Sequence, residues 1–188
     1  MPDRISTFSC NYSFHRELLT RVACDDRLLE KFRNIKLLIL DVDGVLTDGK
    51  IWLTANGEEM KSFHTHDGLG IQSLQRAGIL IAIISSRQSV IVEHRMQELG
   101  VTHVYQGQAS KIAAFETLIT KLRLPEDATA YVGDDLPDLP VMTKVGLSIA
   151  VNNAVAPVKA CADWHTQRNG GEGAVREVCD MILASQNK

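Results

Sequence analysis

Short, continuous apolar runs separated by amphipathic stretches are the feature that most restricts the fold of this chain. The first run, residues 37–40, reads Leu-Leu-Ile-Leu, which is typical of a strand buried on both faces of a parallel sheet. Further runs alternate with helical patterns: runs at residues 79–84, 130–132 and 147–151, and helical patterns at 71–77, 90–99, 111–122 and 136–144. This alternation predicts an α/β fold, a doubly wound and mostly parallel sheet with helices on both faces.

One segment departs from the alternation. Residues 51–54 and 58–63 flank Asn56-Gly57, a dipeptide typical of hairpin turns. A projecting β-hairpin would have open edges, which predicts either self-association through the hairpin or a hairpin folded back on its own sheet. The helical pattern at residues 18–32 predicts a helix in an N-terminal extension, residues 1–34, before a single domain at residues 35–188.

Length and charge restrict the class of protein. A chain of 188 residues suits one domain with one core. Its net charge of −3 argues against a nucleic-acid or anionic-membrane partner. No apolar run is long enough for a membrane span, and charges interrupt the apolar residues near the N-terminus, which argues against a signal peptide. We therefore expect a cytoplasmic protein.

Acidic residues follow two of the predicted strands. Asp41 and Asp43 come directly after the first run, while Asp134, Asp135 and Asp138 follow the run at residues 130–132. Neighbouring parallel strands would bring both clusters to one edge, where carboxylate oxygens suit Mg²⁺. A solvated turn would explain Asp43, and a helix N-cap would explain one residue of the second cluster. Neither alternative explains an aspartate directly after four apolar residues.

Two further polar residues adjoin predicted element ends. Ser85 follows the run at residues 79–84, where a hydroxyl and exposed amides suit phosphate oxygens. Lys111 begins a predicted helix, where a cation opposes the helix dipole. An anionic substrate or the nearby aspartates would account for this placement, and a solvated lysine is the alternative.

The order of these motifs, Asp-x-Asp, Ser, Lys and Gly-Asp-Asp-x-x-Asp, resembles the haloacid dehalogenase superfamily of phosphotransferases. The chain is more specifically similar to the 3-deoxy-D-manno-octulosonate 8-phosphate phosphatase family, from about residue 35 to residue 183. The stretches that carry this similarity are residues 38–49, 56–59, 67–68, 105–108, 131–135 and 173–180.

The resemblance implies a Mg²⁺-dependent phosphatase of a phosphorylated sugar acid, working through an aspartyl phosphate in lipopolysaccharide precursor synthesis. It implies that Asp41 is the nucleophile and Asp43 the acid and base. Ser85 and Lys111 would contact the transferring phosphoryl group. The implied Mg²⁺ ligands are the Asp41 carboxylate, the Asp43 backbone carbonyl and Asp134, with Asp135 and Asp138 in support.

The resemblance also implies the residues that bind the substrate. They are Asp43, His64, Thr65, His66, Asp67, Gly68, Gln72, Arg87, Arg95 and Lys111. Gln72 and His66 stand where the family usually has arginine, so we expect weaker discrimination for the substrate carboxylate. Ser86 and Glu172 depart from a usual glycine and arginine. Ordinary surface histidines are the alternative for His64 and His66.

Spacing leaves no room for an inserted cap domain. Residues 42–84 are occupied by the hairpin and a helix, and residues 86–110 by a helix and a strand. The site would therefore be open, or closed by another chain. The resemblance implies a homotetramer built on such hairpins. The glycine-rich residues 169–173 would either reach a neighbouring site or turn the chain into the helix predicted at 174–183.

Other functions are weighed against this one. Within enzymes, the rival is a phosphatase of a nine-carbon, sialic-acid-like 9-phosphate. A signalling receiver domain also has a phosphorylated aspartate, but it lacks a second aspartate two residues later, so Asp43 favours the enzyme. A catalytically inactive assembly or regulatory subunit is disfavoured because all four motifs are present.

Overall fold

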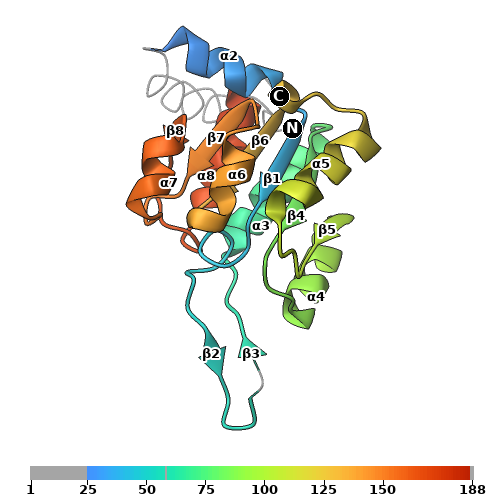
Figure 1. Ribbon diagram of the computed structural model, residues 1–188, viewed down its shortest axis with the longest axis vertical. Helices are drawn as coiled ribbons and strands as arrows, with labels where there is room; N and C mark the ends of the chain where they lie inside the picture. Colours follow the sequence, from blue (N-terminus) through green and yellow to red (C-terminus); the bar gives the residue numbers. More distant parts are fainter. Residues whose placement is uncertain (1–24, 58, 187–188) are drawn as a thin grey trace, which may run out of the picture.

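A six-stranded sheet with the order β5-β4-β1-β6-β7-β8 forms the centre of the molecule (Figure 1). The computed structural model describes residues 25–57 and 59–186. Every neighbouring pair in this sheet is parallel, which confirms the predicted α/β architecture. The strands are β1 (Leu37–Leu40), β4 (Leu80–Ile84), β5 (His103–Tyr105), β6 (Thr129–Gly133), β7 (Leu147–Ala150) and β8 (Trp164–His165).

The central strand β1 places the functional residues. Its four side chains are fully buried, because the sheet is covered on both faces, and this is why the run carries no polar alternation. Leu40 pairs with Ile83 of β4 and with Val132 of β6. The chain moves to one side of β1 and later returns to the other, so the carboxyl end of β1 is the switch point at which such sheets bind ligands.

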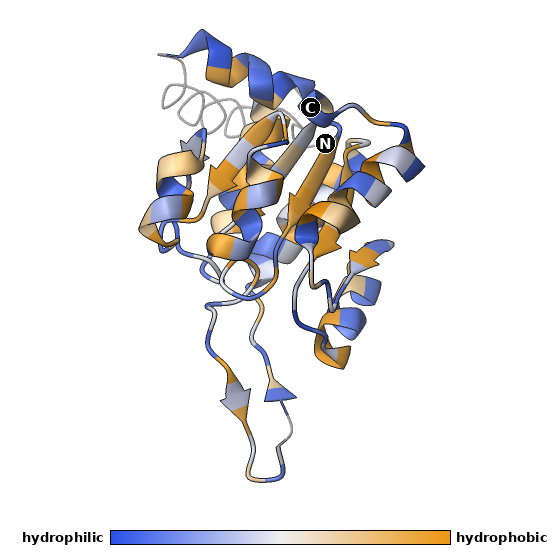
Figure 2. Cartoon of the chain, viewed as in Figure 1, coloured by the Kyte–Doolittle hydropathy of each residue, from blue (hydrophilic) through white to orange (hydrophobic). Residues whose placement is uncertain are grey.

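Helices cover both faces of the sheet. Helix α3 packs against α8, and α5 and α7 pack against α6. Figure 2 shows mostly hydrophobic strands among helices that mix hydrophilic and hydrophobic residues. The helices are α2 (Asp26–Asn34), α3 (Thr65–Arg76), α4 (Val90–Glu98), α5 (Lys111–Leu122), α6 (Leu139–Met142), α7 (Ala156–Cys161) and α8 (Ala174–Ser185), with 3₁₀ turns η1 (Glu126–Ala128) and η2 (Leu136–Asp138).

The first described helix, α2, begins later than the sequence predicts. The Asp25 carboxylate accepts hydrogen bonds from the N–H groups of Arg27 and Leu28 and caps it. Phe32 is fully buried and packs edge-on against Trp164, with ring centroids 5.4 Å apart. The earlier part of the predicted helix, residues 18–24, lies outside the described residues. Among the helices described here, none has the length and apolar character to cross a membrane.

The predicted hairpin is a separate two-stranded antiparallel sheet, β2 (Trp52–Leu53) with β3 (Glu59–Met60). It extends away from the central sheet in Figure 1, so it is not folded back on it. Its apolar side chains are about half exposed, or more: Ile51, Trp52, Leu53 and Met60. Between Asp41 and Ser85 the described residues form only the hairpin, α3 and β4, and between Ser85 and Lys111 only α4 and β5, so the described residues contain no inserted cap.

The glycine-rich segment before α8 packs on the chain's own loop after β1. The Gly171 N–H donates to the Val45 carbonyl oxygen at 3.0 Å. A Cβ at Gly170 would lie 1.6 Å from the Gly44 carbonyl oxygen, so only glycine allows this approach. The segment is therefore held within the chain, which favours the interpretation that it leads into α8 over a reach to a neighbouring site.

Candidate active site

The loop that follows β1 is tight and directs two aspartates. The Asp41 N–H donates to the Val132 carbonyl oxygen at 3.1 Å, which continues the sheet by one residue. The Val42 carbonyl oxygen then accepts three backbone hydrogen bonds and closes the loop. Gly44 has a φ of 93°, and a Cβ there would lie 2.0 Å from Asp134 Oδ2. The loop can therefore approach the second acidic cluster only because position 44 is glycine.

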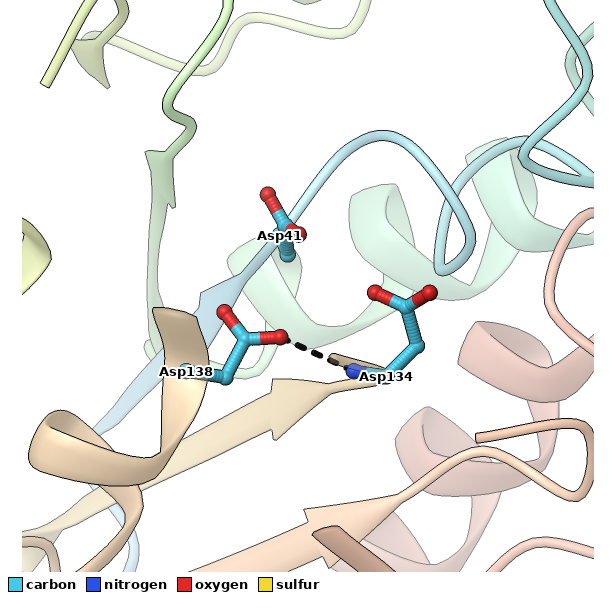
Figure 3. A group of neighbouring side chains, drawn as sticks. All are labelled: Asp41, Asp134 and Asp138. Atoms are coloured by element: carbon cyan, nitrogen blue, oxygen red, sulfur yellow. Dashed lines mark hydrogen bonds between the residues drawn. The ribbon is translucent and has the colours of Figure 1, made fainter. Parts of the chain in front are cut away.

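Asp138 connects the groups of the site. Its Oδ1 accepts hydrogen bonds from Lys111 Nζ and the Tyr131 hydroxyl, both at 2.7 Å. Its Oδ2 accepts the N–H of Asp134 at 2.9 Å (Figure 3) and the N–H of Asp135 at 3.2 Å. Both oxygens of this fully buried carboxylate are engaged by protein donors, so Asp138 orients the cluster.

Lys111 lies between two carboxylates. Its ammonium is 2.8 Å from Asp41 Oδ2 and 2.7 Å from Asp138 Oδ1, and its side chain is 4% exposed. Burial alone would lower the pKa of Lys111, but Asp41 and Asp138 outweigh it and raise the pKa above its ordinary value. The nearby aspartates explain the cation at the start of α5, and the solvated-lysine alternative is wrong.

Three carboxylates converge without enough positive charge to balance them. One oxygen each from Asp41, Asp134 and Asp138 lies within 4.8 Å of the others (Figure 3). Burial, followed by the charge of Asp138, raises the pKa of Asp41 to about 7. Burial and the charge of Asp41 likewise raise the pKa of Asp134 to about 7. Asp134 Oδ1 is buried and has no hydrogen-bond partner among the described residues. This unsatisfied oxygen and the excess of carboxylates fit a divalent cation.

Asp135 contributes in a different way. It is exposed, and its Oδ1 accepts the N–H of Leu136 at 2.8 Å. With Asp138 it forms a capping box at the start of η2. Capping therefore accounts for Asp135 and Asp138, whereas the sequence predicts that a cap would explain one residue of this cluster. Asp134 is the remaining carboxylate and can hold a cation.

Ser85 completes the site from β4. Its N–H donates to the Tyr105 carbonyl oxygen at 2.9 Å, and its hydroxyl accepts the Arg87 N–H at 3.3 Å. These bonds fix a buried hydroxyl at the end of the strand. A cavity of about 290 Å³ opens in front of it. Its lining includes eight of the residues selected from the sequence: Asp41, Asp43, Ser85, Arg87, Lys111, Asp134, Asp135 and Asp138.

The other residues selected for substrate binding do not line this cavity. His64, Asp67, Gly68 and Arg95 lie around a separate gap too narrow for a water molecule, together with Leu46, Phe63, Ile71, Met96 and Leu99. Thr65 and His66 are exposed on α3, and Gln72 is half-buried. His64 caps α3, since its Nδ1 accepts the His66 N–H at 3.2 Å, and Asp67 accepts the Arg176 N–H at 2.8 Å. Their contact with substrate stays a prediction.

Three residues beside the site were not selected from the sequence. Tyr131 supports Asp138 from inside β6. Glu59 and Lys61 extend from the second arm of the hairpin to Asp43 and Arg87. Strand alternation is the signal that could have indicated the last two, because residues 59 and 61 share one face of the hairpin.

Comparison with known proteins places this geometry in a family. Residues 100–178 match the haloacid dehalogenase-like hydrolase family. The chain is 52% identical over 161 residues to the 3-deoxy-D-manno-octulosonate 8-phosphate phosphatase of Escherichia coli strain K12, which covers 86% of each protein. The crystal structure of the Yersinia pestis phosphatase of that name superposes with a TM-score of 0.86 at 47% identity, covering 87% of this chain and 88% of that one.

A second structural relative carries ligands. The 3-deoxy-D-manno-octulosonate 8-phosphate phosphatase of Moraxella catarrhalis was crystallised in complex with a magnesium ion, a phosphate ion and a KDO molecule. Its structure superposes with a TM-score of 0.85 at 44% identity, covering 87% of this chain and 94% of that one.

Proposed function

Because this chain belongs to the 3-deoxy-D-manno-octulosonate 8-phosphate phosphatases, haloacid dehalogenase-like hydrolases, we propose that its aspartate cavity hydrolyses that sugar-acid phosphate with Mg²⁺. The products are the free eight-carbon acid and inorganic phosphate. The observation that carries the proposal is the placement of Asp41, which lies at the end of β1, in the cavity and within 2.8 Å of Lys111.

The first chemical step is transfer of the phosphoryl group to Asp41. An electron pair of an Asp41 carboxylate oxygen forms the new bond to phosphorus, and the bond from phosphorus to the sugar oxygen breaks. The leaving sugar oxygen keeps that electron pair and takes a proton from the Asp43 carboxyl group. The Lys111 ammonium and the Ser85 hydroxyl lie at the same cavity and stabilise the phosphoryl oxygens.

The second step hydrolyses the aspartyl phosphate. Asp43, now ionised, removes a proton from a water molecule as the water oxygen bonds to phosphorus. The bond from phosphorus to the Asp41 oxygen breaks, which releases inorganic phosphate and restores both carboxyl groups to their starting states. Each step thus leaves Asp43 in the protonation state that the next step needs.

The residues present fit Mg²⁺. The Asp41 and Asp134 carboxylates and the Asp43 backbone carbonyl would hold the ion, with Asp135 and Asp138 in support, and the unpartnered Asp134 Oδ1 is the oxygen that most needs it. When bound, Mg²⁺ offsets the repulsion between the nucleophile and the substrate phosphate.

The test is steady release of phosphate from sugar-acid phosphates with and without Mg²⁺. We expect turnover of the eight-carbon 8-phosphate, abolition by a chelator, and a loss of several orders of magnitude in Asp41→Asn. Residual activity of about a tenth of wild type, in a preparation free of wild-type enzyme, would contradict the nucleophile assignment. The nine-carbon 9-phosphate belongs in the same screen, and a higher kcat/KM for it would favour that alternative substrate.

Selectivity for the carboxylate is a separate measurement. Gln72 and His66 replace cations of the family pattern, and each missing charge-assisted bond is worth roughly 1–3 kcal/mol. We expect weak preference for the acid phosphate over a similar phosphate without the carboxylate. A preference of about a thousandfold, or about 4 kcal/mol, would mean that another cation takes over.

We also propose the larger organisation of the protein. Residues 35–188 act as a capless phosphatase domain that follows the extension at residues 1–34, and the enzyme works in the cytoplasm. The exposed apolar side chains and open edges of the hairpin support self-association, as a homotetramer.

A further inference from the structure

A lysine of the hairpin is buried against the proposed acid–base residue. Lys61 follows β3, and its side chain is 2% exposed. Its Nζ donates a hydrogen bond to Asp43 Oδ1 and lies 3.2 Å from Glu59 Oε1. An ammonium with so little access to water requires anionic partners, and these two carboxylates supply them. Lys61 is therefore not a solvated surface lysine.

The carboxylate of Glu59 is also fixed by two further donors. Arg87 Nη2 and the Ser89 hydroxyl each donate to it, to Oε1 and Oε2 respectively, both at 2.7 Å. The Ser89 hydrogen bond and the charges of Lys61 and Arg87 outweigh burial and hold the pKa of Glu59 below its ordinary value. The hairpin arm is thereby joined to the turn after β4, and Lys61 is held between fixed groups.

Lys111 and Lys61 each pair with a different two carboxylates of the site. Lys111 pairs with Asp41 and Asp138, whereas Lys61 pairs with Asp43 and Glu59. The two aspartates of the first motif, only two residues apart, are thus held toward different cations. Lys61 donates its hydrogen bond to Oδ1 of Asp43, whereas Arg87 Nε lies 3.8 Å from Oδ2, beyond hydrogen-bond distance. Oδ2 is therefore the oxygen left to exchange a proton with the substrate.

We propose that Lys61 is a positioning residue that orients the Asp43 carboxyl group for proton transfer to the leaving sugar oxygen, with Glu59 fixing Lys61. The inference rests on the proposed function, because it assigns Lys61 a role through Asp43. Proton transfer requires hydrogen-bond reach, and a misplacement of about 1 Å can cost about a hundredfold in rate.

The experiment compares two esters that differ in their need for a proton. The sugar-acid 8-phosphate releases its sugar as an alkoxide, which needs a proton from the acid. 4-Nitrophenyl phosphate releases a stable phenolate, which does not. The quantity is kcat/KM with Mg²⁺, which includes only steps up to the first irreversible phosphoryl transfer and omits hydrolysis of the aspartyl phosphate. The variants are Lys61→Met and Lys61→Arg. The matched control is Lys50→Met, since Lys50 lies on the first arm, is 68% exposed and pairs with Asp48.

We expect Lys61→Met to lower kcat/KM for the sugar ester by about 30- to 100-fold, and for the aryl ester by less than about threefold. Lys61→Arg keeps the charge and should stay within about fivefold of wild type on both esters. Lys50→Met should change neither by more than about twofold. Equal losses on the two esters would indicate a merely structural role and overturn the inference, and so would full activity of Lys61→Met on the sugar ester.

Asp43→Asn separates failure of this inference from failure of the proposed function. A wild-type enzyme that does not hydrolyse the sugar ester contradicts the proposed function itself. If Asp43→Asn loses activity mainly on the sugar ester while Lys61→Met does not, only the role of Lys61 is overturned. Should Lys61→Met fail to fold, Glu59→Gln takes its place, because it weakens the hold on Lys61 from the other side. Glu59→Gln should lower kcat/KM by less than Lys61→Met does, and again more for the sugar ester than for the aryl ester. Equal losses on the two esters would overturn the inference.

Discussion

The glycine that faces Asp134 offers a direct test of how the metal site is built. Gly44 has a φ of 93°, and an alanine Cβ there would lie 2.0 Å from Asp134 Oδ2. The left-handed backbone costs alanine about 1–2 kcal/mol, and the smaller entropy of the unfolded chain offsets about 0.4–1 kcal/mol of this. The atom in the way is the end of a side chain, so Asp134 can rotate aside at the expense of its position toward the cation.

Gly44→Ala should therefore affect metal binding far more than folding. We expect a loss of about 1 kcal/mol in the free energy of unfolding, measured by urea denaturation, and Mg²⁺ affinity weakened by about 10- to 100-fold. Affinity is obtained by fitting the rise of Tm with the Mg²⁺ concentration c to a stabilisation of RT ln(1 + c/Kd). The matched control is Gly78→Ala, because Gly78 has a φ of 84° and no atom within 4 Å of its Cβ position. If both variants respond to Mg²⁺ like wild type, the proposed link between Gly44 and Asp134 is refuted.

Three further variants address the packing, the hairpin and a buried charge. Gly170→Ala should destabilise the fold by about 2 kcal/mol or more in urea denaturation, because its Cβ would meet the backbone oxygen of Gly44 at 1.6 Å and neither can rotate away. Trp52→Glu should lower the mass in solution and reduce kcat/KM while Mg²⁺ still raises Tm; a folded monomer with full kcat/KM would exclude a shared site. Burial raises the pKa of Asp67, so its ionised form weakens folding as pH rises through that pKa. Asp67→Asn should therefore gain more stability relative to wild type at pH 7 than near pH 4, and an equal effect at both pH values would contradict this.

The central strand, helix α5 and the proposed catalytic aspartates could be predicted because a single local signal defines each. β1 and α5 have the bounds that the sequence predicts, since an uninterrupted apolar run and a clear helical pattern mark them. α7 and β8 were not predicted, because six and two residues are too few for a periodic pattern. Asp41 and Asp134 meet because their strands are neighbours, and this pairing follows from topology once β1 is central.

The parts of the site that could not be predicted depend on contacts distant in sequence. Asp138 has a pattern typical of a helix cap or a metal ligand, and only the fold shows that Lys111 and Tyr131 occupy one of its oxygens. Lys61 has the sequence environment of an ordinary strand lysine, and its burial depends on Asp43, which lies eighteen residues earlier. Strand alternation places residues 59 and 61 on one face of the hairpin, but it does not indicate which charges distant in the sequence they pair with.

The hairpin connects the proposed self-association with the proposed chemistry. Met60 lies between Glu59 and Lys61 in the second arm of the hairpin, so its side chain points to the opposite face, where it is 53% exposed. A second chain that packs on Met60 would fix the hairpin arm whose other face holds Lys61 against Asp43. Ordering of the hairpin by a partner would then strengthen the orientation of Asp43 with no partner side chain entering the cavity. On this reasoning, Trp52→Glu should reduce kcat/KM for the sugar ester more than for 4-nitrophenyl phosphate, whereas a site closed by partner residues would lose activity on both esters alike.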